Sequence, residues 1–246
     1  MKIMTKRVVG SLLIVMLICT VLMPFGVAEK RVASGSFYGM SWQVTDGVLL
    51  LGEENTPQMV WFDLAMHYDD WPWDKIRDEI VEVRCVGPVI VSGSIGGLIE
   101  SCKYVKTIDL SAMDVSGVVD MTGVFAGCQS LMNINIDGWN TEQVTSMERM
   151  FRYCSNALSF DLSMLNTARV TNMYEMFYMC ENLTGLNLAG WDISSVENME
   201  RMFMGCTKLT EFHFNEWSAS NVVRLMTEYD ADVPKWLINT RLSPNP

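Results

Sequence analysis

The sequence predicts an α/β repeat solenoid, with parallel strands on one face and short helices on the other, preceded by a small β-rich N-terminal cap. Three observations predict this fold. A repeat of constant length is present, apolar residues alternate in one half of each repeat, and apolar residues fall at steps of three and four in the other half. The chain has 246 residues, 49% of them hydrophobic, which is enough for a sizeable core.

The repeat is 26 residues long and is marked by five evenly spaced cysteines: Cys102, Cys128, Cys154, Cys180 and Cys206. Columns of Met, Phe, Val and Trp keep the same step. We number the units from these cysteines, so unit one begins at Cys102 and unit five at Cys206. A single unit cannot bury its apolar faces alone, so the units are expected to stack against their neighbours.

Each unit reads as a strand, a turn and a helix. In unit four, Leu186 and Leu188 alternate with Asn187, as a half-buried strand requires. The second half predicts a helix with one apolar stripe: Val196, Met199, Met202, Phe203 and Cys206. In unit two, Thr145 and Glu148 have the spacing of a capping box at a helix start.

The ends of the repeat divide the chain into four segments. Ile95, Leu98 and Ile99 stand where Met, Met and Phe occur before later cysteines, and Asp232 occupies a cysteine position, so the apolar columns end there. We expect a signal peptide at 1–28, a β-rich cap at 37–92, a solenoid of five units at 93–231, and a C-terminal cap and tail at 232–246.

The N-terminus has the order of an export signal. A short basic region precedes an almost wholly apolar run from Val8 to Met23, and Gly26-Val27-Ala28 offers small residues for cleavage before Glu29. An uncleaved signal anchor, or a lipid anchor on Cys19, are the alternatives. After cleavage we expect a secreted or cell-surface protein, of bacterial origin, with no integral membrane segment.

The charge balance argues against nucleic acid as a partner. The formal net charge is −11, and cleavage removes three basic residues, Lys2, Lys6 and Arg7. Nucleic-acid binding depends on Lys and Arg that neutralise phosphates, and no basic stripe overrides the total.

The repeats resemble the BspA-type leucine-rich repeats of bacterial surface proteins. The resemblance rests on Trp139-Asn140-Thr141 followed by Val144-Thr145-Ser146-Met147, Met150-Phe151 and Cys154, and it covers roughly residues 95 to 230. It implies a leucine-rich-repeat solenoid in a secreted or surface-displayed binding protein, with a role in adhesion. The segment from Ser41 to Leu49 resembles, more weakly, the β-rich region that precedes such repeats.

The cysteines and methionines are interpreted as packing residues. Cysteines on adjacent units point the same way, which favours a column of buried thiols over disulfides. The alternative is that at least one disulfide forms, with Cys85 and Cys102 the best candidates. The methionines on the apolar stripe are predicted to be buried: Met121, Met147, Met150, Met173, Met176, Met199 and Met202.

The sequence gives little support for catalysis, so we expect no enzyme activity, no cofactor and no metal. Only His67 and His213 are present, without a short-spaced Cys and His cluster. Asp69, Asp70 and Asp74 could bind calcium, but they lack the spacing of a calcium loop.

The outward residues of the predicted strands form polar columns. One column is nearly all Asp and Asn: Asp109, Asn135, Asp161, Asn187 and His213. The column before it contains Thr107, Asn133, Ser159, Gly185 and Glu211. These columns are either a ligand-binding strip or a solvated face whose Asx side chains bond neighbouring units.

The function predicted from the sequence is binding of a protein or glycan ligand, at the cell surface or in a host, through the strand face. The alternative is carbohydrate binding by the Trp-rich N-terminal region, through Trp42, Trp61, Trp71 and Trp73.

Overall fold

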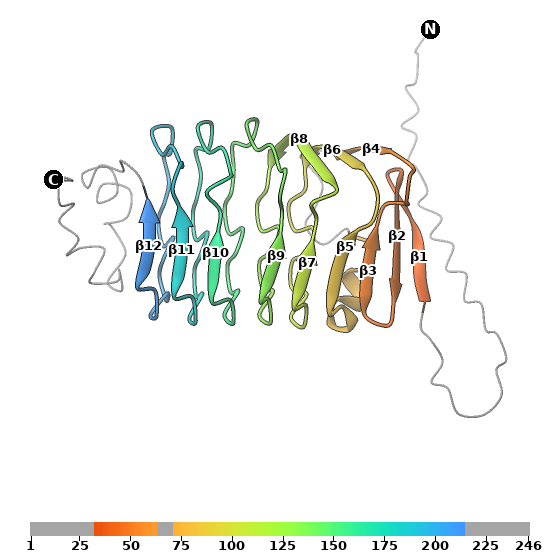
Figure 1. Cartoon of the computed structure of the whole chain (residues 1–246), viewed down its shortest axis with the longest axis horizontal. Coiled ribbons are helices and arrows are strands. Elements are labelled where there is room, and N and C mark those ends of the chain that lie inside the picture. The colour runs from red at the N-terminus through yellow and green to blue at the C-terminus, as the bar shows by residue number, and fades with distance from the viewer. Residues whose placement is uncertain (1–31, 63–70, 215–246) are drawn as a thin grey trace, which may run out of the picture.

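The computed structural model describes residues 32–62 and 71–214, which form an elongated stack of strands and turns (Figure 1). Within these residues the only helical element is the 3-10 helix η1 (Asp74–Glu79). The strands are β1 (Val32–Phe37), β2 (Met40–Thr45), β3 (Val48–Leu51), β4 (Gln58–Phe62), β5 (Glu82–Cys85), β6 (Val89–Ser94), β7 (Thr107–Asp109), β8 (Met113–Asp120), β9 (Asn133–Asn135), β10 (Ser159–Asp161), β11 (Gly185–Leu188) and β12 (Glu211–Phe214).

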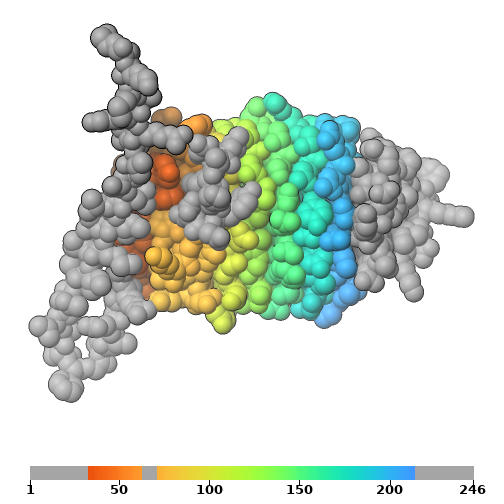
Figure 2. All heavy atoms as spheres, turned by 180° about the vertical axis from the view of Figure 1, so that it is seen from behind, coloured from red at the N-terminus to blue at the C-terminus, as the bar shows by residue number. Residues whose placement is uncertain are grey.

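The cap and the repeats share one sheet. Strands β1, β2 and β3 pair antiparallel, and β5, β7 and β9 then add in parallel to give a six-stranded sheet. A second parallel sheet contains β10, β11 and β12, and a third contains β4, β6 and β8. Seen from behind, successive units form bands across the molecule (Figure 2).

The prediction of a helix in each unit was wrong. The segment after β8 instead forms consecutive turns that bond to the next unit: the N–H groups of Met121, Gly123, Phe125 and Gly127 donate to the carbonyls of Ser146, Glu148, Met150 and Arg152 at 2.6–3.0 Å. Between them, the N–H groups of Val124 and Ala126 donate to the carbonyls of Met121 and Gly123, three residues back, at 3.4 and 3.0 Å. In an α-helix each N–H donates to the carbonyl four residues back. Here every second N–H donates to a carbonyl of the next unit instead.

The backbone conformation explains why a helix cannot form here. Gly123 and Gly127 have φ values of 63° and 74°, in the left-handed region, and the equivalent residues of later units, such as Arg149 and Glu175, share it. Two left-handed residues four apart break a right-handed helix. Thr145 and Glu148 likewise form no capping box, since the Thr145 hydroxyl donates to the carbonyl of Val119 at 3.1 Å.

The turn segments make up the second face of the stack, which we call the turn face: residues 120–127, 146–153, 172–179 and 198–205. Isolated bridges link Asp120, Ser146, Asn172 and Asn198 along it in parallel. The architecture is therefore a β-solenoid of strands and turns rather than an α/β solenoid.

The core lies between the strand and turn faces and is built from columns of identical residues. The Phe rings of the turn face stack, with Phe151 and Phe177 at 5.7 Å and 3° between ring planes, and Phe177 and Phe203 at 5.7 Å and 2°. The seven methionines predicted on the apolar stripe are all buried: Met121, Met147, Met150, Met173, Met176, Met199 and Met202. The burial pattern was thus right although the helix was not.

Candidate binding surface

The strand face is the outward side of the repeat strands, formed by Thr107, Asp109, Asn133, Asn135, Ser159, Asp161, Asn187, Glu211 and His213; Gly185 lies in the same column but is buried. The strand registers place Thr107 beside Asn133 and Asp109 beside Asn135. They also align Ser159 with Gly185 and Glu211, and Asp161 with Asn187 and His213. The predicted columns therefore form in units one and two and again in units three to five, but β9 and β10 are not paired.

The Asp and Asn side chains of the strand face cap the turns that follow their strands. Oδ1 of Asp109 accepts from the Ser111 N–H at 3.1 Å and from its hydroxyl at 2.7 Å, and Asp161 makes the same two bonds with Ser163. Asn135 accepts from the Asp137 N–H at 3.1 Å. The residue type is thus set partly by local turn geometry.

These hydrogen bonds stabilise the ionised aspartates. The pKa of Asp109 lies below its ordinary value, chiefly because the Ser111 hydroxyl and then the Ser111 N–H donate to the carboxylate. The pKa of Asp161 is lowered in the same way by Ser163. Both carboxylates are exposed and charged at neutral pH, so the strand face carries negative charge along its middle column.

A cluster of ion pairs on the turn face has no counterpart among the residues selected from the sequence. Its centre is the buried carboxylate of Glu175, with Arg149 Nε at 3.3 Å, Arg152 Nε at 2.7 Å and Arg201 Nη1 at 3.7 Å. Guanidinium groups also lie over tyrosine rings, as Arg149 does over Tyr174 at 5.3 Å. Arg149, Glu175 and Arg201 occupy one column of the repeat but differ in residue type and charge, so a search for repeated residues cannot find them.

The tryptophans of the cap are mostly structural. Trp42, Trp71 and Trp73 are buried, and the indole N–H groups of Trp71 and Trp73 donate to the carbonyls of Gly96 and Leu98 at 3.0 and 2.9 Å. Only Trp61, 67% exposed, is available among the four named for sugar binding. The four tryptophans therefore do not form an exposed aromatic cluster.

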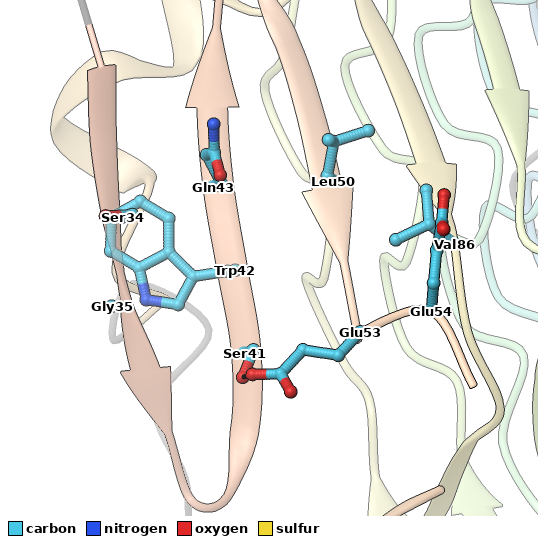
Figure 3. A pocket seen from close by; sticks show the side chains of 10 residues that line it. Ser34, Gly35, Ser41, Trp42, Gln43, Leu50, Glu53, Glu54 and Val86 are labelled. Carbon is cyan, nitrogen blue, oxygen red and sulfur yellow. Dashed lines mark hydrogen bonds between the residues drawn. The ribbon is translucent and has the colours of Figure 1, made fainter. Parts of the chain in front are cut away.

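An open hollow of about 480 Å³ lies on the cap (Figure 3). The Trp42 ring lies across β1 at one side of it, and the side chains of Ser41 and Glu53 point toward each other, with a hydrogen bond of 2.6 Å. Glu54 and Val86 line the far side.

The six described cysteines are free and buried: Cys85, Cys102, Cys128, Cys154, Cys180 and Cys206. The interpretation of the five cysteines that share the 26-residue register as a column of buried thiols is thus confirmed. Each of the last four thiols donates to a carbonyl 29 residues back, as Cys154 does to Phe125 at 3.3 Å. The bridge considered between Cys85 and Cys102 is absent from the described residues. Burial raises the pKa of Cys85 to about 11 and of Cys102 to about 12, so neither is a thiolate at neutral pH.

Within the described residues, no group of three or more His, Cys, Asp or Glu is arranged to hold a metal ion, and no helix is long and apolar enough to cross a membrane. Asp74 is bound to Arg77 at 2.8 Å. The predicted signal peptide, His67, Asp69, Asp70 and the residues after Phe214 lie outside the described ranges.

The fold and its surface define a class of protein, a β-solenoid of stacked 26-residue units with a β-rich cap. The family model described as "Mycoplasma protein of unknown function, DUF285" matches residues 94–217, half of the chain. The chain belongs to this family.

Other comparisons found distant likeness. A leucine-rich repeat protein from Eubacterium ventriosum, known from a crystal structure, is 19% identical with a TM-score of 0.35. The match covers 65% of this chain and 43% of that one, so this chain spans less than half of its length. No curated protein matches the chain.

Proposed function

We propose that this chain is a secreted or surface-displayed binding protein that recognises a macromolecular ligand through its strand face. The supporting observation is that Asp109, Asn135, Asp161 and Asn187 point away from the core and form a polar, partly charged surface across several units. Solenoids use such extended surfaces to bind partners. The resemblance to BspA-type repeats supports the same proposal.

The proposal is tested with a matched pair of charge-removing variants. Asp109→Asn with Asp161→Asn removes two negative charges, and the amide oxygens keep the turn bonds, as Asn135 and Asn187 already do. Glu142→Gln with Glu197→Gln removes the same charge from exposed sites outside the strand face. A ligand is first captured by the mature protein from extracellular host proteins and glycans.

The strand-face pair should then change the association rate and salt dependence of binding, because exposed charges act mainly on encounter. The control pair should leave both unchanged. The reverse result would show that the ligand uses another surface.

Export is the second part of the proposal, supported by the order of residues 1–28. Protein isolated from the medium or envelope should begin at Glu29 or within a few residues of it. Intact Met1 on cytosolic protein would refute export.

Carbohydrate binding by the cap stays a second candidate through the exposed Trp61, beside the exposed Met59 on the same face of β4. Trp61→Ala should abolish retardation of the protein in polysaccharide-containing gels. Unchanged retardation by the variant would remove this candidate.

A further inference from the structure

The ladder of parallel strands is interrupted at one step of the described units, between β9 and β10. Strands β7 and β9 are paired, as are β10 and β11, and β11 and β12. No strand pairing joins β9 to β10, and most Cα pairs between these two strands are more than 8 Å apart. Figure 1 shows a wider spacing between β9 and β10 than between β10 and β11.

Side-chain bonds between units explain where the interruption falls. The indole N–H of Trp139 donates to the Leu110 carbonyl at 3.1 Å, which links units two and one, and Trp191 donates to Leu162 at 2.8 Å, which links units four and three. Leu165 occupies the equivalent position of unit three, and its side chain has no N–H to donate. Units two and three therefore lack this link.

The Asx column repeats the same alternation. The Asn187 amide donates to Asp161 at 3.1 Å, and the Asn135 side chain bonds Asp109. At the step between, the Asp161 carboxylate has no hydrogen to give to Asn135. The sequence thus omits both side-chain links at the one step where the main chain is unpaired.

The interruption is local, because units two and three are bonded on either side of it. Below it, the Asn156 N–H donates to Gln129 at 3.1 Å. Above it, the Thr141 hydroxyl donates to the Asn166 carbonyl at 2.9 Å. The turn face also continues unbroken behind it through the bridge from Ser146 to Asn172.

Apolar side chains are exposed along both sides of the interruption. Met132 and Leu158, which directly precede β9 and β10, are 59% and 58% exposed. Ile134 is only partly buried, whereas its equivalents Ile108 and Leu186 are buried. At the next step, Leu158 accepts from the N–H groups of Thr184 and Gly185, but among the described residues no such bond joins Leu158 or Ser159 to Met132.

We propose that this interruption binds an extended polypeptide segment of a partner protein, which pairs its main chain with the facing edges of β9 and β10. The proposal rests on the proposed function and names the partner of the strand face. Two strand edges that face each other present donors and acceptors that an extended main chain complements. An inserted strand needs about twice 4.8 Å between its neighbours, and most Cα pairs between β9 and β10 are more than 8 Å apart.

The alternation of the strands defines which side chains the segment carries. Its inward residue meets Ile134 and Phe160 and is apolar. Its outward residues lie beside the Asp161 carboxylate, which favours a cationic or polar side chain. The partner is therefore recognised by a short alternating polar and apolar sequence in extended form.

The experiment uses a fluorescent peptide that reproduces residues 182–190, because this sequence already pairs in parallel with β10 in the fold. The control peptide has the same side chains and N-methyl groups at alternate amides, which block main-chain bonding. The full-length wild-type protein should bind the first peptide at least tenfold more tightly than the second. Equal affinities, or no binding of either, would overturn the proposal.

A second arm closes the interruption by a reversible crosslink. In the variant Asn133→Cys with Ser159→Cys, a disulfide between the introduced thiols draws β9 and β10 together, since bridged residues have Cα atoms within about 7 Å. Mass spectrometry verifies the bridge. The reduced variant should bind the peptide and the oxidised variant should lose at least tenfold; unchanged binding by the oxidised form would contradict insertion.

A third readout needs no variant. On peptide addition, the wild-type amides of Leu158, Ser159 and Asp161, which face β9, should gain protection from hydrogen exchange, and absence of that gain would also contradict insertion. If the strand-face ligand responds to the Asp109 and Asp161 variants but binds the oxidised protein normally, the proposed function stands and this inference fails.

Discussion

Single aspartates of the strand face serve two purposes, since each caps a turn and also presents a charge to solvent. Asp109 and Asp161 bond the serine two residues on, and the equivalent Asn135 and Asn187 bond the N–H at the same place. Both residue types satisfy the turn, but only aspartate adds charge. The fold therefore accepts either aspartate or asparagine at these positions, and the charge can be set by the needs of ligand binding.

The same two aspartates should make stability depend on pH. Their folded pKa values lie below the unfolded value of about 3.9. A lowered folded pKa gives stability that is present above the unfolded pKa and is lost as pH falls through the folded pKa. The wild type should therefore lose its advantage over Asp109→Asn with Asp161→Asn as pH falls below about 4.

Thermal unfolding of both proteins at pH 7, 5 and 3 measures this effect. Asp192, whose pKa is lowered by Ser194, is present in both and cancels in the comparison. A difference in Tm that stays constant over this range would contradict the assignment of the pH effect to the two strand-face aspartates.

The cysteine column makes a second prediction for single residues. Cys154 is fully buried, and Cys154→Ala should lower the free energy of unfolding by on the order of 1 kcal/mol, through lost apolar burial and a small cavity. Urea unfolding measures the loss. Mass spectrometry after alkylation should find Cys128, Cys154 and Cys180 unmodified in folded protein and modified after unfolding; reaction in the folded state would contradict their burial.

The period and the burial of residues could be predicted from the sequence, because side chains that recur every 26 residues must occupy equivalent places. The helix could not be distinguished from turns, because two consecutive turns also direct residues three and four apart inward. Gly97, Gly123, Gly127 and Gly205 were the available signal, since all four have positive φ. Arg149, Glu175 and Arg201 adopt the same positive-φ conformation at equivalent positions, so the residue types there do not reveal it.

At the level of strands and turns, substitutions at two glycines distinguish the cost of backbone strain from the cost of steric crowding. Gly138 and Gly93 have similar φ values of 81° and 87°, but a Cβ on Gly138 would meet nothing within 4 Å, whereas on Gly93 it would lie 2.0 Å from the Phe62 carbonyl oxygen. Gly138→Ala should cost about 1 kcal/mol from strain alone. Gly93→Ala should cost at least about 2 kcal/mol more, because β4 must move.

Equilibrium unfolding in urea measures both variants against wild type. Equal losses of unfolding free energy for the two variants would show that a Cβ at position 93 is accommodated beside β4 without further cost.

Across the whole molecule, the links between units divide the strand face into two blocks joined through the turn face. The candidate columns could be predicted from the 26-residue register, but the break between them could not, because it arises from what unit three lacks. Leu165 replaces a tryptophan donor, and Asp161 replaces an amide donor. A loss of hydrogen bonds at one step leaves the apolar pattern unchanged.

Hydrogen exchange of the free protein tests this division directly. The amides of Leu158 and Ser159 have no strand partner in the described part of unit two, so they should exchange faster than those of Thr184 and Gly185, which donate to Leu158 at 2.8 and 3.2 Å. Local opening controls exchange, so protection should follow these bonds. The Met147 amide, bonded to Asn172 at 2.9 Å across the same step, should stay protected. If Leu158 and Ser159 are protected as strongly as Thr184 and Gly185, the strand ladder is continuous in solution and the two blocks act as one.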